Sequence, residues 1–165
     1  MMSSHGLRLA TAAFSDDDAQ ALVAQVQAEY VLLYGEPDVS PLEEGVFTPP
    51  RGAFFVGRQD GAAVAMGGWR LRSDVRPWGL SPAAEVKRMY VAPAARRRGH
   101  ARAVLAHLER TAREVGAAVM VLETGTAQPE AIAMYEAAGY ERVESFGHYA
   151  WSPQQRCFGK RLVTG

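Results

Sequence analysis

Arginines gather around a glycine at residues 96–102, which read Arg-Arg-Arg-Gly-His-Ala-Arg. A short apolar segment that ends at Pro93 precedes this run, and apolar residues then recur at helical spacing from Ala101 to Val115. The backbone N–H groups and the dipole of a helix that begins here can receive a phosphate, and arginines add charge-assisted hydrogen bonds. The run therefore predicts a phosphate-binding turn; a plain solvated turn remains the alternative for Arg97.

Strands and helices alternate on both sides of this turn. The predicted strands span residues 7–13, 53–56, 62–71, 85–91, 117–122, 140–145 and 156–162. One predicted helix starts at the acidic segment 15–18 and stops at Gly35, a second follows the arginine turn, and a third covers residues 131–138 after Pro129. Residues 36–52 and 73–83 contain several prolines and are predicted loops. This order predicts a mixed α/β sheet with crossover helices, in a single domain of residues 1–165.

The bulk composition is that of an ordinary globular protein. Of 165 residues, 18 are basic and 18 acidic, so no global charge recruits nucleic acid or an anionic membrane. Residues 1–10 lack the apolar core of a signal peptide, and no apolar run is long enough to span a bilayer. Cys157 is the single cysteine, which fits a reducing compartment, and it is either a nucleophile or an inert strand residue. We expect a cytoplasmic protein.

Two blocks of the chain resemble the GNAT superfamily of acetyl-CoA-dependent N-acetyltransferases. The family pattern Gln/Arg-x-x-Gly-x-Gly/Ala is matched by residues 96–101, after the strand that ends in Val91-Ala-Pro93. The second pattern, Asn-x-x-Ala-x-x-x-Tyr-x-x-x-Gly-Phe/Tyr, is matched by residues 128–140, which include Ala131, Tyr135 and Gly139. Gln128 departs from this pattern, because the family usually has asparagine there. The two blocks lie in the family's order, and the resemblance covers roughly residues 53–140.

The resemblance implies a single α+β domain of the GNAT type. Its mixed central sheet has about seven strands with helices on both faces, and a V-shaped opening separates two central parallel strands, here residues 85–91 and 117–123. Acetyl-CoA would be the cosubstrate, with no metal. Its pantetheine arm would pair with the main chain near Met89 and Val91. The residues expected to contact the rest of the cosubstrate are Arg96, Arg97, Arg98, Gly99, His100, Ala101, Arg102, Gln128 and Tyr135, with the pyrophosphate on the N–H groups of residues 98–101.

The implied chemistry needs a base and profits from an acid. An alkyl ammonium of pKa ~10.4 is deprotonated in only about one molecule in 2,500 at pH 7. Glu85 is the expected base, directly or through water, and strand alternation predicts that it shares a face with Met89 and Val91. The alternative is an ion pair with Lys87, Arg88 or another cation. Tyr135 is expected to protonate the departing sulfur; otherwise it is a half-buried aromatic.

The acceptor side is less defined by the sequence. Candidates for acceptor contacts are Trp69, Arg88, His148 and Tyr149, although aromatic residues in strands also build cores. Loops 36–52 and 73–83 could enclose a small pocket, so we expect a small-molecule or amino-acid-like primary amine rather than a protein. Dimers are frequent in the family, and a homodimer is possible here.

Three other functions remain open at this stage. A catalytically silent acyl-CoA sensor would bind acyl-CoA at the arginine-rich turn but would not transfer its acyl group. A protein N-acetyltransferase would use the same chemistry on a polypeptide. A nucleic-acid binder would use residues 96–102 with an affinity that falls steeply with salt.

Overall fold

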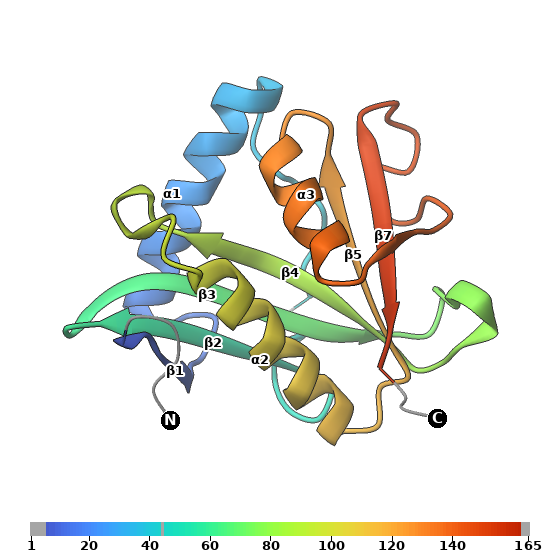
Figure 1. Ribbon diagram of the computed structural model, residues 1–165, viewed down its shortest axis with the longest axis horizontal. Coiled ribbons are helices and arrows are strands. Elements are labelled where there is room, and N and C mark those ends of the chain that lie inside the picture. The colour runs from blue at the N-terminus through green and yellow to red at the C-terminus, as the bar shows by residue number, and fades with distance from the viewer. Residues whose placement is uncertain (1–5, 44, 163–165) are drawn as a thin grey trace.

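The computed structural model describes residues 6–43 and 45–162. Its strands and helices, labelled as in Figure 1, are β1 Arg8–Thr11, α1 Asp17–Tyr34, β2 Gly52–Gln59, β3 Ala62–Arg72, β4 Ala83–Val91, α2 His100–Glu114, β5 Val119–Gly125, α3 Pro129–Ala137, β6 Glu141–Arg142 and β7 Gln155–Arg161. Short 3₁₀ turns lie at Pro77–Gly79 and Pro93–Ala95. The strands form one seven-stranded sheet in the order β1-β2-β3-β4-β5-β7-β6. The predicted mixed sheet of about seven strands, with α-helices between the strands, is confirmed.

Local chemistry sets the helix ends where the sequence places them. The Asp16 carboxylate accepts the Ala19 N–H at 3.1 Å and caps α1, which ends at Gly35 in the left-handed conformation. Pro129 occupies the first turn of α3. The predicted strand at 140–145 is shorter than expected, because the chain leaves the sheet after Arg142 for the loop that leads to β7. The prediction that residues 1–10 are not a signal peptide concerns a segment of which residues 1–5 lie outside the described residues.

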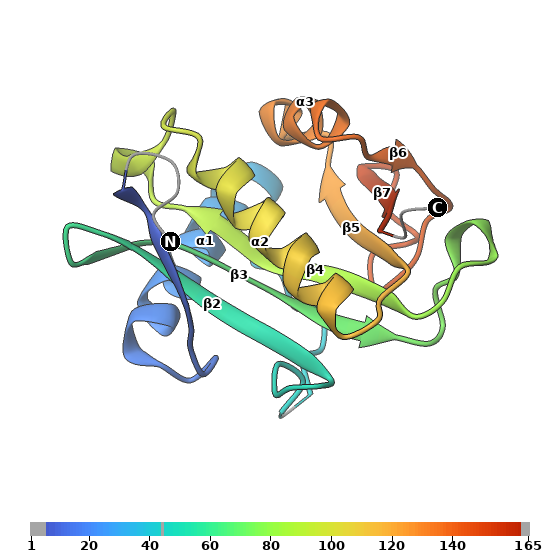
Figure 2. The same ribbon diagram turned by 60° about the horizontal axis from the view of Figure 1, so that its bottom comes forward.

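Helices cover both faces of the sheet, as expected (Figure 2). On one face, α2 and α3 pack through Val104, Leu105, Leu108 and Tyr135 into the larger apolar core. On the other face, α1 packs through residues such as Leu22 against β2 and β3 in a second core. None of the helices in the described ranges is long and apolar enough to cross a membrane.

The two parallel strands at the centre stay paired only at their beginnings. β4 and β5 are the sheet's parallel neighbours, and their register joins residues 83–85 to residues 119–121. Beyond Glu85 and Val121 the described strands separate, and Figure 1 shows β4 and β5 running apart between α1 and α3. The V-shaped opening predicted between these strands is thus present.

A β-bulge in β4 changes which side chains share a face. Met66 lies opposite Tyr90 whereas Gly68 lies opposite Lys87, so β4 carries one extra residue at this place, and Arg88 has φ +57°. Met89 therefore packs into the core beneath α2, while Glu85 lies on the opposite face beside arginines of β3. The prediction that Glu85 shares a face with Met89 and Val91 is wrong, because simple alternation does not survive the bulge.

Candidate active site

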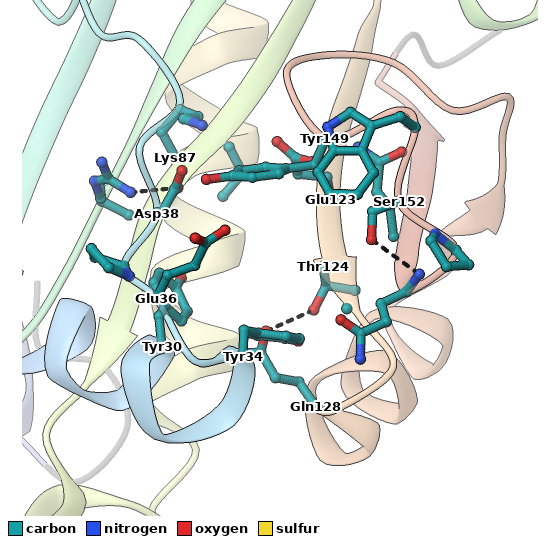
Figure 3. Close-up of a pocket in the computed structure, with 18 residues that line it drawn as sticks. Tyr30, Tyr34, Glu36, Asp38, Lys87, Glu123, Thr124, Gln128, Tyr149 and Ser152 are labelled. Carbon is teal, nitrogen blue, oxygen red and sulfur yellow. Dashed lines mark hydrogen bonds and ion pairs between the residues drawn. The ribbon is translucent and has the colours of Figure 1, made fainter.

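A cavity of about 360 Å³ lies where β4 and β5 separate. Its walls come from six segments: the end of α1, the loop at residues 36–38, β4 at 86–88, β5 at 123–125, Gln128 at the start of α3, and Tyr149 with residues 151–155 before and at the start of β7. Figure 3 shows these side chains around the cavity, with the ring of Tyr149 reaching across it toward Asp38. Ligand pockets in open sheets form where the carboxyl ends of neighbouring parallel strands part, so this cavity is the candidate active site.

Glu123 presents a carboxylate to this cavity from β5. It is partly buried, and burial raises the pKa of its carboxyl above the usual value, with the charges of Glu85 and Asp38 adding to the increase. The Gln155 side-chain amide, which donates to Oε2 at 2.6 Å, and the charge of Lys87 both oppose this increase. The same amide donates to the Phe146 carbonyl at 2.8 Å. A carboxylate with a raised pKa is a stronger base than a free carboxylate, which suits it to accept a proton. Sequence reasoning missed Glu123; its only signal was a charged residue at the end of an apolar strand.

Glu85 is in a different environment. Its side chain is 1% exposed, and Oε1 accepts hydrogen bonds from Arg70 Nε at 2.9 Å and Arg72 Nη1 at 3.2 Å. It does not line the cavity between the strands. Glu85 is therefore paired with two guanidinium groups, those of Arg70 and Arg72. This agrees with the ion-pair alternative, but the partners are neither Lys87 nor Arg88.

Arg88, at the bulge, ties the loop after α1 to the sheet. Arg88 Nη1 lies 2.7 Å from Asp38 Oδ2, with the two side chains 6% and 19% exposed. Asp38 Oδ1 accepts hydrogen bonds from the backbone N–H and the hydroxyl of Ser40. Tyr149 accepts the N–H of Val39 at 2.8 Å. These contacts bring Arg88 and Tyr149, two of the expected acceptor residues, to the cavity wall.

The other two acceptor candidates lie elsewhere. Trp69 is 1% exposed in the core beneath α2, where its indole N–H donates to Thr111 Oγ1 at 2.9 Å. The cavity at the β4–β5 opening is not lined by Trp69. His148 lies at a second, adjacent cavity and contacts the ring of Tyr149 edge-on at 4.7 Å between ring centres.

The arginine-rich turn has the geometry of an anion-binding helix start. Gly99 is left-handed at φ +78° and precedes α2, and no side chain caps this helix end within the described residues. The N–H groups of a first helical turn have no intrahelical acceptor, so an uncapped turn offers them to a ligand. Gly99, Arg97 and Arg102 are exposed. Within residues 98–101, Arg98 and Gly99 are exposed while His100 is buried, so a ligand would reach this helix start from the side of Gly99.

The remaining arginines of the turn already have protein partners. Arg96 Nη2 pairs with Glu29 Oε2 at 2.5 Å, and its Nε donates to the Val91 carbonyl at 2.9 Å. Arg98 Nη1 donates to Gln59 Oε1 at 2.9 Å, close to the buried ring of His100. Arg96 and Arg98 therefore fix the turn against α1 and β2, in addition to any contact with a ligand.

Tyr135 lies below the opening, in the core between α3 and the sheet. It is 7% exposed, and its ring stacks edge-on with Tyr140 at 5.9 Å between centroids. Burial raises the pKa of its phenol, and the neighbouring Tyr30 adds to the increase. Tyr30 lines the cavity, whereas Tyr135 is not among its lining residues.

Gln128 joins α1 to the start of α3 across the cavity. Its Oε1 accepts hydrogen bonds from the Tyr34 hydroxyl at 3.1 Å and the Thr124 hydroxyl at 3.4 Å, and it does not cap α3. A glycine at 125 makes this approach possible, since a Cβ there would lie 2.1 Å from the Tyr34 hydroxyl. The glutamine that replaces the family's usual asparagine at position 128 thus accepts a hydrogen bond from Tyr34 of α1.

The single cysteine is not placed to act as a nucleophile. Cys157 is 1% exposed and lies opposite Glu123 in the β5–β7 register. Burial raises the pKa of its thiol to about 11. A protonated, enclosed thiol is poorly reactive, which favours the inert alternative.

Comparison with known proteins agrees with this geometry. The sequence profile of the Acetyltransferase (GNAT) family matches residues 18–140. An "IAA acetyltransferase" of Azospirillum brasilense is 34% identical over 100 residues, a match that spans 61% of each chain. The "Uncharacterized N-acetyltransferase YjgM" of Escherichia coli K12 is 31% identical over 129 residues, or 74% of each chain.

Solved structures show the same fold. A Klebsiella pneumoniae protein classed as an acyl-CoA N-acyltransferase superposes with a TM-score of 0.78 at 28% identity, over 95% of this chain and 98% of that one. A GNAT-family acetyltransferase of Staphylococcus aureus gives a TM-score of 0.73 at 16% identity, covering 95% and 99% of the two chains. The chain belongs to the GNAT family and is an acetyl-CoA-dependent N-acetyltransferase.

Proposed function

We propose that this enzyme acetylates the primary amine of a small molecule held in the cavity between β4 and β5, with Glu123 as the base. One observation carries the proposal: a carboxylate whose pKa is raised by burial faces a cavity at the point where the parallel strands separate. We further propose that residues 1–165 form one catalytic domain, because β1 and β7 belong to the same sheet.

Two features of the described residues support the binding of acetyl-CoA. The uncapped start of α2 supports a pyrophosphate on the N–H groups of residues 98–101, where Gly99 lets the backbone approach without a Cβ. Past Glu85, β4 has no strand partner on its β5 side within the described residues, so main-chain groups near Met89 and Val91 can bond a pantetheine arm. Exposed Arg97 and Arg102 add positive charge beside the phosphates.

Glu123 and Tyr135 then divide the proton transfers. When bound, the thioester supplies an activated acetyl group. Glu123 removes one proton from the acceptor ammonium, the neutral nitrogen forms the new C–N bond, and the C–S bond breaks. The nitrogen then loses a second proton, which through solvent replaces the proton that the sulfur receives. Tyr135 is the proposed proton donor to the departing sulfur; burial raises the pKa of its phenol, which keeps the group protonated but also makes it a weaker acid. Freeing the amine from its proton costs about 4.6 kcal/mol at pH 7, which is the barrier that a base must lower.

A small acceptor is favoured over a polypeptide. Tyr149 lies across the cavity, and residues 151–155 close its β7 side. A space of about 360 Å³ is in the range of small-molecule sites. The name of the Azospirillum relative also points to a low-molecular-weight compound for that protein.

The pH dependence of a Glu123→Gln variant tests the proposal. Glu123 must be deprotonated to act, so wild-type kcat/KM falls as pH drops through its raised pKa. The amide cannot accept the proton, so the variant loses this acid limb and about 10²–10⁴-fold in kcat. Acetyl-CoA affinity, measured by calorimetry, stays at the wild-type value.

Two further variants separate base loss from general damage. Glu85→Gln should retain the fall of kcat/KM at low pH, whatever its absolute rate. Glu136→Gln, on the exposed side of α3, should match wild type in rate and melting temperature. A Glu123→Gln enzyme with the wild-type profile would refute the assignment. Tight acetyl-CoA binding with no turnover on any amine would support the silent sensor instead.

A further inference from the structure

A second cavity of about 300 Å³ adjoins the first, and its walls carry an excess of positive charge. Arg70, Arg72 and Lys87 line it, and it shares Lys87 and Glu123 with the cavity between the strands. A bound molecule can therefore extend from one cavity into the other past these two side chains. Nothing in the proposed transfer of the acetyl group uses the three cations.

Lys87 is a buried ammonium that makes no close ion pair with a described residue, although the charges of Glu123 and Asp38 act on it at longer range. The residue is 5% exposed, and Nζ makes one hydrogen bond, to Ser40 Oγ at 3.3 Å. Among the described residues no carboxylate oxygen lies within 4 Å of it. An ammonium has three donors, and burying one without an anion is costly. Its location on the wall of both cavities indicates that an anionic group of a ligand completes its surroundings.

The arginines do not have enough carboxylate of their own. A single oxygen of Glu85 accepts from both Arg70 and Arg72, and Asp74 chelates Arg72 at 2.9 and 2.6 Å. Arg70 is left with a 3.5 Å contact to the Pro41 carbonyl as its other hydrogen bond within the described residues. Glu43 also lines this cavity but pairs with Arg51. Apart from Glu123, the carboxylates left to face Arg70, Arg72 and Lys87 are therefore those of Glu85 and Asp74.

On the β5 side of the two cavities, the wall instead carries a negative charge, that of Glu123. Glu123 supplies the carboxylate that, under the proposed function, receives the acceptor ammonium. Lys87 lies on the neighbouring strand, across the opening between β4 and β5. The two shared side chains therefore present one anion and one cation to a molecule that spans both cavities.

We propose that the acceptor is an amino-acid-like zwitterion, whose carboxylate binds Lys87 and Arg70 in the second cavity while its amine faces Glu123 in the first. This inference rests on the proposed function, because it assumes that the amine reacts beside Glu123. A carboxylate fits since a planar, two-oxygen anion can take one hydrogen bond from an ammonium and one from a guanidinium.

Matched acceptors test the inference. Each of a set of amino acids is compared with its carboxamide and with the amine that lacks the carboxyl group, and acetyl transfer is followed by CoA thiol release. We expect kcat/KM to be roughly 10–100-fold higher for the carboxylates, the effect of one charge-assisted hydrogen bond. Aminophosphonates form a further arm, and a preference for them over the carboxylates would overturn the assignment of a carboxylate site.

Lys87→Met keeps the length of the side chain and removes its charge. It should bring the carboxylate-to-carboxamide ratio close to one. Lys160→Met is the matched control, because Lys160 lies on β7 and pairs with Glu109 away from both cavities; it should keep the wild-type ratio. An unchanged ratio in Lys87→Met would overturn the inference.

A binding measurement decides the matter without turnover. N-acetylated amino acids and their carboxamides are titrated calorimetrically into the enzyme with CoA present. The carboxylates should bind more tightly to wild type, and Lys87→Met should abolish the difference. Equal transfer to carboxylates, carboxamides and plain amines would refute the carboxylate site and leave the proposed function intact. No transfer to any amine would refute the proposed function, with the titration still reporting on the site.

Discussion

Glu85 and Glu123 carry the same carboxyl group on neighbouring parallel strands, yet their surroundings give them different tasks. Two guanidinium groups donate to Glu85, which neutralises it beneath the second cavity. Glu123 receives one amide N–H, and burial raises the pKa of its carboxyl at the cavity wall. A general base must take up a proton, so Glu123, which accepts from a neutral amide, is suited to that role. Glu85, which accepts from two cations, is suited to holding the Arg70 and Arg72 side chains in place.

The thiol of Cys157 gives a second test at this scale. Burial raises its pKa from 9.0 to about 11, which lowers the thiolate fraction at neutral pH roughly 100-fold relative to the unfolded chain. A disulfide reagent should therefore label the native enzyme slowly and the urea-unfolded chain rapidly. Since the folded pKa is the higher one, Cys157 lowers stability only as pH rises above its unfolded value. Rapid stoichiometric labelling of native protein would contradict this environment.

Local residue chemistry explains which parts of the site could be predicted from the sequence. The arginine turn, the stop at Gly35 and the start of α3 at Pro129 depend on a few neighbouring residues, and all three are found. The raised pKa of Glu123 depends on its burial and on the charges of Glu85 and Asp38, and the Gln155 side chain that opposes the increase lies 32 positions away in the sequence. No local pattern encodes such contacts. Trp69 illustrates the same limit, because its burial depends on α2 packing over β3.

At the scale of elements, the bulge in β4 and the uncapped start of α2 position the site. The bulge gives β4 one extra residue opposite the Met66–Gly68 segment of β3. At this bulge the Arg88 side chain pairs with Asp38. Counting alternate residues fails here, because one inserted residue moves every later side chain to the other face. α2 then begins at an exposed glycine whose left-handed backbone exposes N–H groups.

A charge at the start of α2 should weaken cosubstrate binding. Gly99→Asp puts a β-carbon on a backbone at φ +78° and a negative charge beside the expected pyrophosphate. We expect acetyl-CoA affinity to fall about 10- to 100-fold, or about 1.4–2.8 kcal/mol, in calorimetry. Gly116→Asp is the matched control, because Gly116 also has a positive φ and lies just beyond the other end of the same helix. Equal affinities for the two variants would count against the phosphate site.

At the scale of the whole molecule, three distant parts of the chain meet over one opening in the sheet. α1 and its following loop come from one side, the segment before β7 from the other, and β4 and β5 form the floor (Figure 3). The chain has no net charge, yet Lys87 and Glu123 stand on opposite sides of this opening. Charge separation within the cavity, rather than a global field, would select the acceptor.

A crystal structure of the enzyme with acetyl-CoA tests this arrangement most directly. We expect the pyrophosphate on the N–H groups of residues 98–101, the pantetheine arm along β4 between Val86 and Val91, and the thioester at the cavity wall formed by Glu123. A cosubstrate that lies outside the opening between β4 and β5, or whose thioester is out of reach of Glu123, would contradict it.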